Sequence, residues 1–586
     1  MCGIFAYLGH KPNAGTIILD GLKSLEYRGY DSWGVAIKTS DDKIHLEKHT
    51  GKIGNNVFPE IHSFAGIGHT RWATHGGVTE NNAHPHTNAK RTIIVVHNGI
   101  VENFSEIKNM LINEGYSFIS ETDTEVIAHL LDHLHKHISD HKQLVLELFS
   151  KVRGMNAIIV FFPESEEFFA IKNGSPVVFG KNENELFIAS DASALIPHTN
   201  SVYFLDDNEM LYLSRKQYAV TDNEGLEKHI EFTELSYSKE DVDLGSFPHF
   251  MMKEIHEQPR VLRSIIDTQK RTIEELAEVI KKAYGTYFIG CGTAFYAGLA
   301  GTYLFSKIAK RHVNVAVGSE FPYLIDFIKE KSLVIALSQS GETIDIISSL
   351  KKVKEKNTKI MAITNVLGST LYRMSDYKLL LNAGPEKCVL ATKSFTAKIA
   401  LLYLISHAID QTYEDGCVYL KKAIAEVERI IKDYSKLQKL ADMLMNKNHI
   451  FILGRGVSYP TALESALKIK EVSYIHAEGF AGGELKHGVM ALIEEGTPVI
   501  IYNPSDETYE DTLSSAHEVK ARGAYVIGIS DKPNAVYNEF IQIENCGDAT
   551  VIPNVVIAQL LGYFLALAKG YDPDKPRNLA KSVTVK

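Results

Sequence analysis

The sequence predicts a multidomain protein in which an α+β region is followed by two α/β regions with parallel sheets. The length of 586 residues corresponds to three or four domains at about 150 residues each. Residues 2–225 contain short apolar strands separated by Gly and Asn turns, of which TIIVVHNGIV and NAIIVFFPES are the clearest, and a helix begins near Thr124. Beyond residue 248, apolar strands alternate with amphipathic helices, which is typical of α/β layers.

The composition favours a packed enzyme without nucleic-acid or membrane partners. Hydrophobic residues make up 45% and charged residues 23%, as in ordinary globular proteins. The formal net charge of −10 provides no broad basic surface for nucleic acid or an anionic membrane. There is no apolar run of about 18 residues and no basic segment at the start, so we expect neither a membrane span nor a signal peptide. Five cysteines in a chain of this length fit a reducing, cytoplasmic location.

Composition shifts divide the chain into five segments. The polar stretch SYSKEDVDLGS, which lacks apolar periodicity, marks a boundary near residues 236–246. We therefore expect an N-terminal domain over 2–225, a linker over 226–248, two lobes over 249–425 and 426–575, and a C-terminal tail over 576–586.

The two lobes repeat one pattern. TYFIGCGTAFYAGLA resembles HIFILGRGVSYPTALE, VIALSQSGETIDIISSL resembles VIIYNPSDETYEDTLSS, and KIMAITN resembles YVIGISD, always at an offset of 164 to 166 residues. Three ordered pairs at a nearly constant offset predict a duplication, with the same strand order in both lobes.

The front region offers a candidate N-terminal nucleophile. Cys2 follows the initiator Met, and removal of that Met would place a thiol and a free α-amine on one residue, so that the amine can take the thiol proton. A small buried residue at a strand start is the alternative. Asn98 and Gly99, just after a strand, could donate to an oxyanion, although Asn-Gly is also a common hairpin turn.

Two further polar segments could hold an amino acid. The loop GHTRWATHGG combines Arg71, Trp72, Thr74 and His75, and the Arg71 guanidinium could bind a carboxylate. Asp123 in ETDTEV could hold an ammonium group. The alternatives are a surface ion pair for Arg71 and a helix N-cap for Asp123.

Six motifs in order, MCGIFAYLG, EYRGYDSWG, GHTRWATHG, NAHPH, VVHNGIVENF and ETDTEV, resemble the class II glutamine amidotransferase domain. The resemblance implies an αββα fold of the N-terminal-nucleophile type. It implies that Cys2 attacks the glutamine amide and that Asn98 and Gly99 form the oxyanion hole. The residues implied to hold glutamine are Arg71, Trp72, Thr74, His75 and Asp123, with Trp72 also gating an internal ammonia channel.

The first lobe contains a candidate phosphate site. In VIALSQSGETIDIISSL, a strand ending at Leu337 leads into a loop, Ser338 to Thr343, and then a helix. Hydroxyls, backbone N–H groups and the helix dipole converge there on an anion, although simple capping by Ser and Thr is the alternative. The second copy, NPSDETYED, has Asp506 where Gly341 stands, so we expect the first lobe to bind the ligand.

Two lysines are candidates for sugar chemistry. Lys468 and Glu471 lie three apart on a predicted helix, where a surface ion pair is the alternative. Lys581 lies among apolar and small residues of the tail, and a buried lysine can form a Schiff base with a carbonyl; a solvated lysine is the alternative.

With SQSGET, LGRG, the Lys468-to-Gly488 segment and the terminal PRNLAKSVTV, nearly the whole chain resembles the family of isomerising amidotransferases built from tandem sugar isomerase (SIS) domains. The resemblance implies that glutamine and fructose 6-phosphate are converted to glucosamine 6-phosphate and glutamate, the first step of hexosamine synthesis, without metal or organic cofactor. Lys581 would engage the C2 carbonyl, Glu471 would move the proton between C1 and C2, and His487 of a neighbouring subunit in a homodimer would assist ring opening. The residues implied to bind the sugar phosphate are Thr293, Ser338, Gln339, Ser340, Thr343, Val389 and Lys468.

Some features depart from this resemblance or leave alternatives. Ala391 and Ala294 stand where the family often has hydroxyl residues, which keeps another keto-sugar phosphate, or deamination or deglycation, open as alternatives. A non-catalytic sugar-phosphate sensor is a third interpretation. A stripe of histidines four residues apart on the expected helix is a weak metal candidate, and a solvated helix face is favoured instead; its members are His129, His133, His137 and His141.

Overall fold

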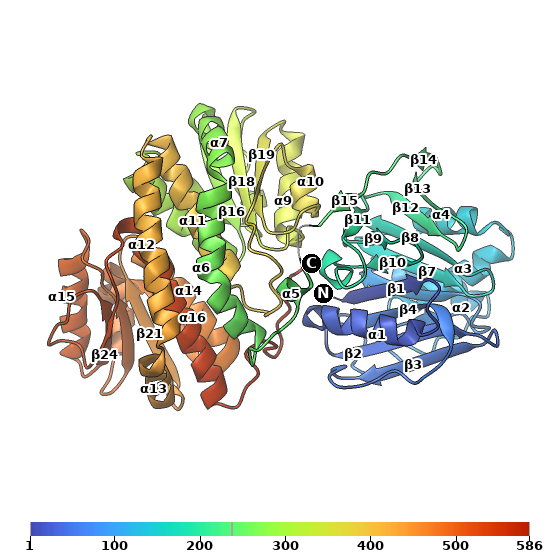
Figure 1. Cartoon of the computed structure of the whole chain (residues 1–586), viewed down its shortest axis with the longest axis horizontal. Coiled ribbons are helices and arrows are strands. Elements are labelled where there is room, and N and C mark those ends of the chain that lie inside the picture. The colour runs from blue at the N-terminus through green and yellow to red at the C-terminus, as the bar shows by residue number, and fades with distance from the viewer. Residues whose placement is uncertain (1, 236–237, 585–586) are drawn as a thin grey trace. The chain divides into compact units, whose positions relative to one another are not determined.

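A computed structural model of the chain describes residues 2–235 and 238–584. Contacts divide it into two compact units (Figure 1). The first comprises Met1–Asp243 together with Gly368–Thr370 and Ala580–Lys586, and the second comprises Leu244–Leu367 and Leu371–Leu579.

Two antiparallel sheets form the first unit. One has the order β15-β11-β9-β10-β1-β4-β2-β3, with the bounds Thr233–Glu234, Ser201–Phe204, Val178–Lys181, Leu186–Ala189, Gly3–Leu8, Ser63–Arg71, Ser32–Thr39 and Ile44–Thr50. The other has the order β14-β13-β12-β8-β7-β6-β5, with the bounds Glu227–Lys228, Tyr218–Asp222, Glu209–Leu213, Glu167–Asn173, Asn156–Phe162, Ile94–Gly99 and His86–Thr87. The strands predicted in TIIVVHNGIV and NAIIVFFPES are β6 and β7.

Alternating side chains along these strands build a four-layer αββα sandwich. In β1, Phe5 and Tyr7 pack with helix α1 (Ala14–Leu25), while Ile4 and Ala6 face the core between the two sheets. In the second sheet, Val95 faces the core under the helices α2 (Phe104–Asn113), α3 (Glu125–His135) and α4 (His141–Lys151). The αββα fold and the helix expected from about Thr124 are therefore confirmed.

Two five-stranded parallel sheets in the second unit share one strand order. The first is β17-β16-β18-β19-β20, with the bounds Asn314–Val317, Gly285–Gly290, Ser332–Ser338, Lys359–Thr364 and Tyr377–Leu380. The second is β22-β21-β23-β24-β25, with the bounds His476–Ala481, His449–Gly454, Pro498–Tyr502, Tyr525–Ser530 and Glu539–Gln542. The repeated segments fall on matching strands, so the predicted duplication is confirmed.

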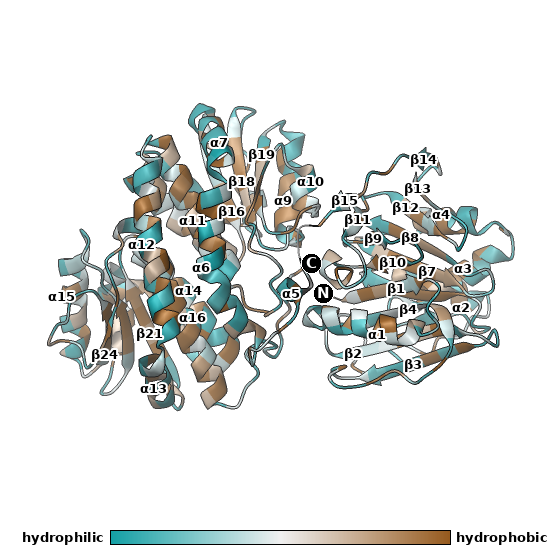
Figure 2. Cartoon of the chain, viewed as in Figure 1, coloured by the Kyte–Doolittle hydropathy of each residue, from teal (hydrophilic) through white to brown (hydrophobic). Residues whose placement is uncertain are grey.

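Helices pack around and between these sheets (Figure 1). Their bounds are α6 (Phe250–Thr268), α7 (Lys270–Lys282), α8 (Thr293–Lys307), α9 (Ile344–Glu355), α10 (Thr370–Met374), α11 (Lys393–Ile409), α12 (Tyr413–Lys432), α13 (Ser435–Leu444), α14 (Ser458–Ser473), α15 (Tyr509–Lys520) and α16 (Val551–Ala568). One core cluster includes residues of both lobes, because α8 and α11 pack together and α14 contacts both α8 and α16. Figure 2 shows α16 as strongly apolar, whereas α7 is largely polar.

Within the described part of the chain, one helix is long and apolar enough to cross a membrane by composition, Gly547–Ala568. In its most apolar stretch of 18 residues, 89% of the residues are buried inside the fold. It is therefore a core helix of the second unit.

Two sequence predictions need correction. Strands β14 and β15 lie in the sheets of the first unit, and a short helix α5 (Lys239–Val242) follows, so the expected linker does not begin at residue 226. The predicted histidine stripe is not one helix face, because α3 ends at His135 and His141 begins α4. His141 stacks on Phe162 at 3.8 Å and lies 2.7 Å from Glu167, which is a structural role.

Candidate active site

Cys2 lies directly before β1, beside the ends of β4 and β6. The antiparallel register pairs Gly3 with Thr70, which brings the residue before β1 next to the residue after β4. The Trp72 N–H points at the Cys2 sulfur at 3.3 Å, and the Asn98 side-chain amide donates to the Cys2 carbonyl at 3.0 Å. Residues that are 70 and 96 positions apart from Cys2 thus converge on it.

The environment of the thiol decides its protonation state. Burial raises the pKa of Cys2, and the Trp72 N–H and the positive charge of Arg71 oppose that rise. A thiol with a raised pKa is a poor nucleophile at neutral pH until a base removes its proton. The site therefore needs a nearby proton acceptor.

The Asn98-Gly99 pair is not the hairpin turn that this dipeptide commonly forms. Both residues complete strand β6, with Asn98 opposite Ala157 and Gly99 opposite Asn156 in β7. Gly99 has φ +143, and a Cβ atom there would lie 2.2 Å from the Met155 carbonyl oxygen. Only glycine fits this position, and the strand end holds both residues beside Cys2.

Of the residues expected to hold glutamine, Arg71 and Asp123 are buried and already have partners. The Arg71 guanidinium donates to the carbonyl oxygens of His75, Gly76 and Gly77, at 3.1 Å for Gly77, and so closes the loop after β4. Asp123 accepts from the Val101 N–H at 2.7 Å and anchors the chain after Gly99.

The other three residues of this set belong to the loop that Arg71 closes. Thr74 is exposed, and His75 packs edge-on against Phe104 at 5.5 Å. Trp72 is half-buried and packs edge-on against Tyr30 at 5.6 Å. All three side chains are therefore exposed or partly exposed, and Trp72 is the one whose backbone contacts Cys2.

In the first lobe of the second unit, the loop after β18 is organised by its own hydroxyl groups. Ser338 Oγ accepts from the Gly341 N–H at 3.0 Å and lies 3.1 Å from Thr343 Oγ1. Ser340 Oγ accepts from the Glu342 N–H at 3.1 Å. Gly341 has φ +67, which suits glycine, and α9 begins directly after Thr343. The predicted loop and helix start are confirmed, and Gln339, which is half-buried, lies in the same loop.

The second lobe replaces this arrangement with a carboxylate. Asp506 Oδ1 accepts from the Thr508 N–H at 2.8 Å and from Thr508 Oγ1 at 2.7 Å. The Asp506 carboxylate thus accepts the hydrogen bonds that Thr508 offers just before α15. Its negative charge repels any further anion at this place.

A buried charge cluster joins the two lobes. Lys468 of α14 has no exposed side-chain surface, lies 2.7 Å from Glu471 and 3.4 Å from Glu464, and donates to Thr293 Oγ1 at 3.3 Å. Thr293 Oγ1 in turn donates to Glu464 at 3.2 Å. Burial raises the pKa of Glu464 to about 7, against the favourable charge of Lys468, and the two carboxylates raise the pKa of Lys468 against its own burial. Lys468 and Glu471 are therefore a buried cluster and not the surface ion pair of the alternative interpretation.

The remaining predicted sugar-site residues lie in three other segments of the chain. Val389 uses its backbone N–H to donate to the Asp574 carbonyl at 3.1 Å. His487 is exposed at the end of a short 3-10 helix, Gly482–His487. Lys581 is half-buried and groups with the first unit, in the segment that begins at Ala580. The structure thus brings Thr293, Lys468 and Glu471 together within the second unit.

Two site residues escaped the sequence analysis. Glu464 lies four residues before Lys468, and the spacing 464, 468 and 471 on one helix face was the available signal. His69 lies 3.1 Å from the Asn98 side-chain oxygen, a contact between two sheets that no local pattern shows.

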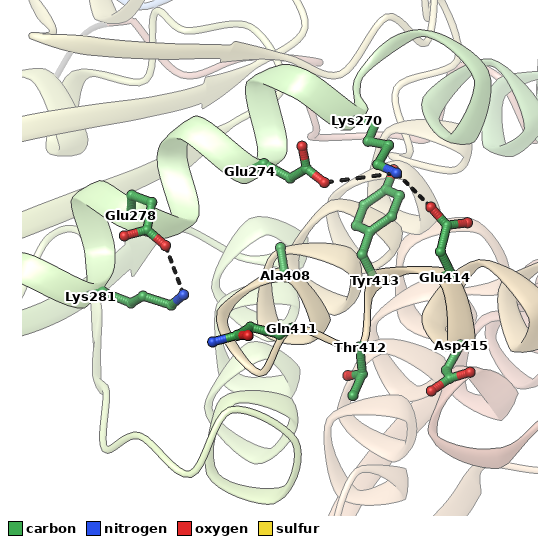
Figure 3. A pocket seen from close by; sticks show the side chains of 10 residues that line it. All are labelled: Lys270, Glu274, Glu278, Lys281, Ala408, Gln411, Thr412, Tyr413, Glu414 and Asp415. Carbon is green, nitrogen blue, oxygen red and sulfur yellow. Dashed lines mark hydrogen bonds and ion pairs between the residues drawn. The ribbon is translucent and has the colours of Figure 1, made fainter.

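An open groove elsewhere in the second unit contains none of the predicted site residues. Figure 3 shows Lys270 between Glu274 and Glu414, at 3.9 and 2.6 Å, and Lys281 beside Glu278 at 2.7 Å. These are exposed ion pairs of the kind that contribute little to stability. Across residues 2–235 and 238–584, no group of three or more His, Cys, Asp or Glu side chains is arranged to hold a metal ion.

Comparison with known proteins assigns both halves of the chain. Residues 69–197 match the glutamine amidotransferase domain family, and residues 280–408 and 443–541 match the SIS domain family. The second half is similar to a solved structure, the C-terminal domain of glucosamine-fructose-6-phosphate aminotransferase from Francisella tularensis, with 33% identity and a TM-score of 0.53. That match covers 57% of this chain and 100% of the other.

Full-length relatives carry one name. The chain is 42% identical to the glutamine–fructose-6-phosphate aminotransferase (isomerizing) of Thermococcus kodakarensis, and 40% identical to the enzymes of that name from Clostridium tetani and Pyrococcus horikoshii. Each comparison covers 100% of both chains. The chain therefore belongs to the family of isomerizing glutamine–fructose-6-phosphate aminotransferases.

Proposed function

We propose that this chain converts fructose 6-phosphate and glutamine to glucosamine 6-phosphate and glutamate. The observation that best supports this function is that the chain has two separate clusters of polar residues, one around Cys2 and one around Lys468. Its full-length relatives are named for this reaction. The first cluster releases ammonia from glutamine, and the second aminates and isomerises the sugar.

Glutamine hydrolysis is assigned to Cys2. Its thiolate attacks the side-chain amide carbon, and the carbonyl oxygen becomes an oxyanion. The C–N bond then breaks, and the nitrogen takes up the proton that came from the thiol and leaves as ammonia. Water hydrolyses the thioester that remains on Cys2, which gives glutamate and restores the thiol. Asn98 Nδ2 and the Gly99 N–H stabilise the oxyanion. The proton acceptor is the α-amine of Cys2 itself, which requires removal of Met1; Met1 lies outside the described residues.

The amino-acid ends of glutamine are assigned to Arg71 and Asp123, with Trp72, Thr74 and His75 around them. Arg71 has five N–H donors and donates to three loop carbonyls in this structure, so the loop and a substrate carboxylate would share one guanidinium. Binding of glutamine is thereby coupled to the position of the loop 75–77. Trp72, which precedes this loop, is the proposed gate for ammonia.

Sugar binding is assigned to the second unit. The phosphate lies in the loop after β18, where Ser338, Gln339, Ser340 and Thr343 offer hydroxyl, amide and backbone donors at a helix start. Thr293, Lys468 and the Val389 segment complete the sugar site. The Asp506 carboxylate in the second lobe supports the choice of the first lobe.

The isomerisation is assigned to three residues. Lys581 engages the C2 carbonyl of the open-chain sugar, Glu471 moves the proton between C1 and C2, and His487 assists ring opening from a neighbouring subunit. A homodimer in the cytoplasm is part of this proposal. The Lys468 ammonium beside Glu471 supports the assignment, because it stabilises negative charge that develops on the sugar oxygens.

A substrate panel tests the proposal. Purified enzyme with glutamine is offered fructose 6-phosphate, other keto-hexose phosphates and glycated amines, and each product is identified by mass spectrometry. Glucosamine 6-phosphate from fructose 6-phosphate is expected. Product from another substrate only would replace this function by amination of that sugar or by deglycation. Absence of product from every substrate would favour a sensor that binds sugar phosphate without catalysis.

A further inference from the structure

His69 is a fully buried side chain that the proposed mechanism does not use. It lies in β4, opposite Ile4 of β1 and Gly34 of β2, and has 0% exposure. Its Nε2 atom lies 3.1 Å from the His97 carbonyl oxygen and 3.1 Å from Asn98 Oδ1. It therefore joins the first sheet to the end of β6.

The chemistry of these contacts fixes which atom carries the proton. A backbone carbonyl oxygen can only accept, so His69 Nε2 must carry hydrogen to make the bond to His97. An N–H group requires an acceptor from Asn98 as well, so the Asn98 amide must present its oxygen to His69. The Asn98 nitrogen then faces the other way, toward the Cys2 carbonyl oxygen 3.0 Å away.

The surroundings of His69 keep this arrangement stable. Burial lowers the pKa of His69 to about 3, so the ring stays neutral at physiological pH. The ring stacks on His84 at 4.1 Å with an interplanar angle of 16°. A neutral ring has one N–H, and the contact to His97 places it on Nε2.

Neighbouring contacts hold the rest of the strand end. The His97 ring lies 2.7 Å from Asn156 Oδ1 and 3.0 Å from Thr124 Oγ1. Asp123 holds the Val101 N–H. The backbone is thus held on both sides of Asn98, whereas the orientation of its side-chain amide depends on the amide's own contacts.

We propose that His69 is a positioning residue that orients the Asn98 amide for catalysis. With Oδ1 on His69 and one Nδ2 hydrogen on the Cys2 carbonyl, the second Nδ2 hydrogen is available for the oxyanion of the glutamine adduct. This inference rests on the proposed oxyanion role of Asn98. Without the His69 donor, the amide can turn its oxygen toward the oxyanion, which would repel the charge.

Matched variants of the full-length enzyme test the inference. His69→Phe keeps an aromatic ring that can stack on His84 but removes the donor, whereas His69→Gln retains an N–H donor. We expect His69→Phe to lower kcat for glutamine hydrolysis by about tenfold to a hundredfold, with KM for glutamine changed less than about twofold. His69→Gln should recover most of the loss.

Two readouts separate positioning from general damage. Alkylation of Cys2 by iodoacetamide forms no oxyanion, so its rate in His69→Phe should equal the wild-type rate. In an Asn98→Ala background, His69→Phe should cause no further loss of kcat, because the residue through which it acts is gone. Losses that multiply, or an unchanged kcat in His69→Phe, would overturn the inference.

The tautomer of His69 can also be measured in the wild-type enzyme, where no substitution can disturb folding. In the wild-type enzyme labelled with 15N-histidine, NMR should show a neutral His69 protonated at Nε2, and a ring protonated at Nδ1 would overturn the inference. If Asn98→Ala itself leaves hydrolysis intact, the oxyanion assignment of the proposed function fails, whatever the His69 tautomer.

Discussion

The Lys468 ammonium lies 2.7 Å from the Glu471 carboxylate, and the lysine side chain has no exposed surface. Lys468 also contacts Glu464 and Thr293, so a helix of the second lobe and the first turn of α8 share one buried polar cluster. Removing charges from water is costly unless each has partners, and this cluster supplies them. The same cluster is the proposed sugar site, so its stability and its chemistry are linked.

Replacing Lys468 by Met should destabilise the second unit. The change leaves the buried Glu464 and its neighbour Glu471 without their cation, and breaking a buried pair in this way costs about 3–5 kcal/mol. Urea unfolding measures the free-energy change. Lys270→Met removes an exposed pair with Glu414 and serves as the control, which should change far less. Equal losses in the two variants would contradict the burial argument.

Glu464 should make the stability of the enzyme depend on pH. Burial raises its pKa to about 7 in the folded state, so between about pH 4.3 and 7 the folded state binds more protons than the unfolded state. This contribution is complete at low pH and is lost as pH rises through about 7. From pH 5 to 8 the wild type should lose about 2–3 kcal/mol more than Glu464→Gln. If the free energy of unfolding, measured with urea, fell by the same amount from pH 5 to 8 in both proteins, the assignment would be refuted.

The duplicated lobes provide a matched test of phosphate binding. Ser340→Ala removes a hydroxyl from the first-lobe loop and should raise KM for fructose 6-phosphate about tenfold, the effect of one hydrogen bond to a charged group. The turnover number should stay nearly constant, because the phosphate is remote from C1 and C2. Ser505→Ala changes the corresponding residue of the second lobe and should leave KM unaltered. A larger effect of Ser505→Ala on KM would place the phosphate in the second lobe and contradict this assignment.

Gly99 should be intolerant of any side chain. In Gly99→Ala, the new Cβ meets the Met155 carbonyl oxygen at 2.2 Å, and φ +143 adds strain of about 1–3 kcal/mol. We expect a loss of both stability and glutamine hydrolysis. Gly115 also has a positive φ, +86, but no neighbouring atom lies within 4 Å of an added Cβ, so Gly115→Ala is the control for calorimetry and activity. A fully active Gly99→Ala would show that the strand end can move.

Much of the fold followed from local pattern, and the exceptions have physical causes. The sheets of both lobes were predictable because each apolar strand lies next to its own amphipathic helix in sequence. The dipeptide Asn98-Gly99 is equally compatible with a hairpin turn and with a strand end. Pairing with Ala157 and Asn156 of β7 makes it a strand end. The histidine stripe failed because equal spacing does not show that a helix stops at His135.

The site was less predictable than the fold. Cys2, Asn98, Lys468 and Glu471 stood out by residue type and motif, and the structure gives them neighbours that support a site. His69 contacts Asn98 across 29 positions and between two sheets, so nothing in its local sequence distinguishes it from a core residue. Asp506 was visible as a charge difference, but its bonds to Thr508 required the folded loop.

Isotope transfer tests the central claim, that glutamine hydrolysis at Cys2 supplies the nitrogen of the amino sugar. The enzyme is incubated with fructose 6-phosphate and glutamine labelled with 15N at the side-chain amide, and the products are analysed by mass spectrometry. We predict labelled glucosamine 6-phosphate in a one-to-one ratio with glutamate for the wild type, and none for Cys2→Ala. Labelled product at the wild-type rate from Cys2→Ala would contradict the account.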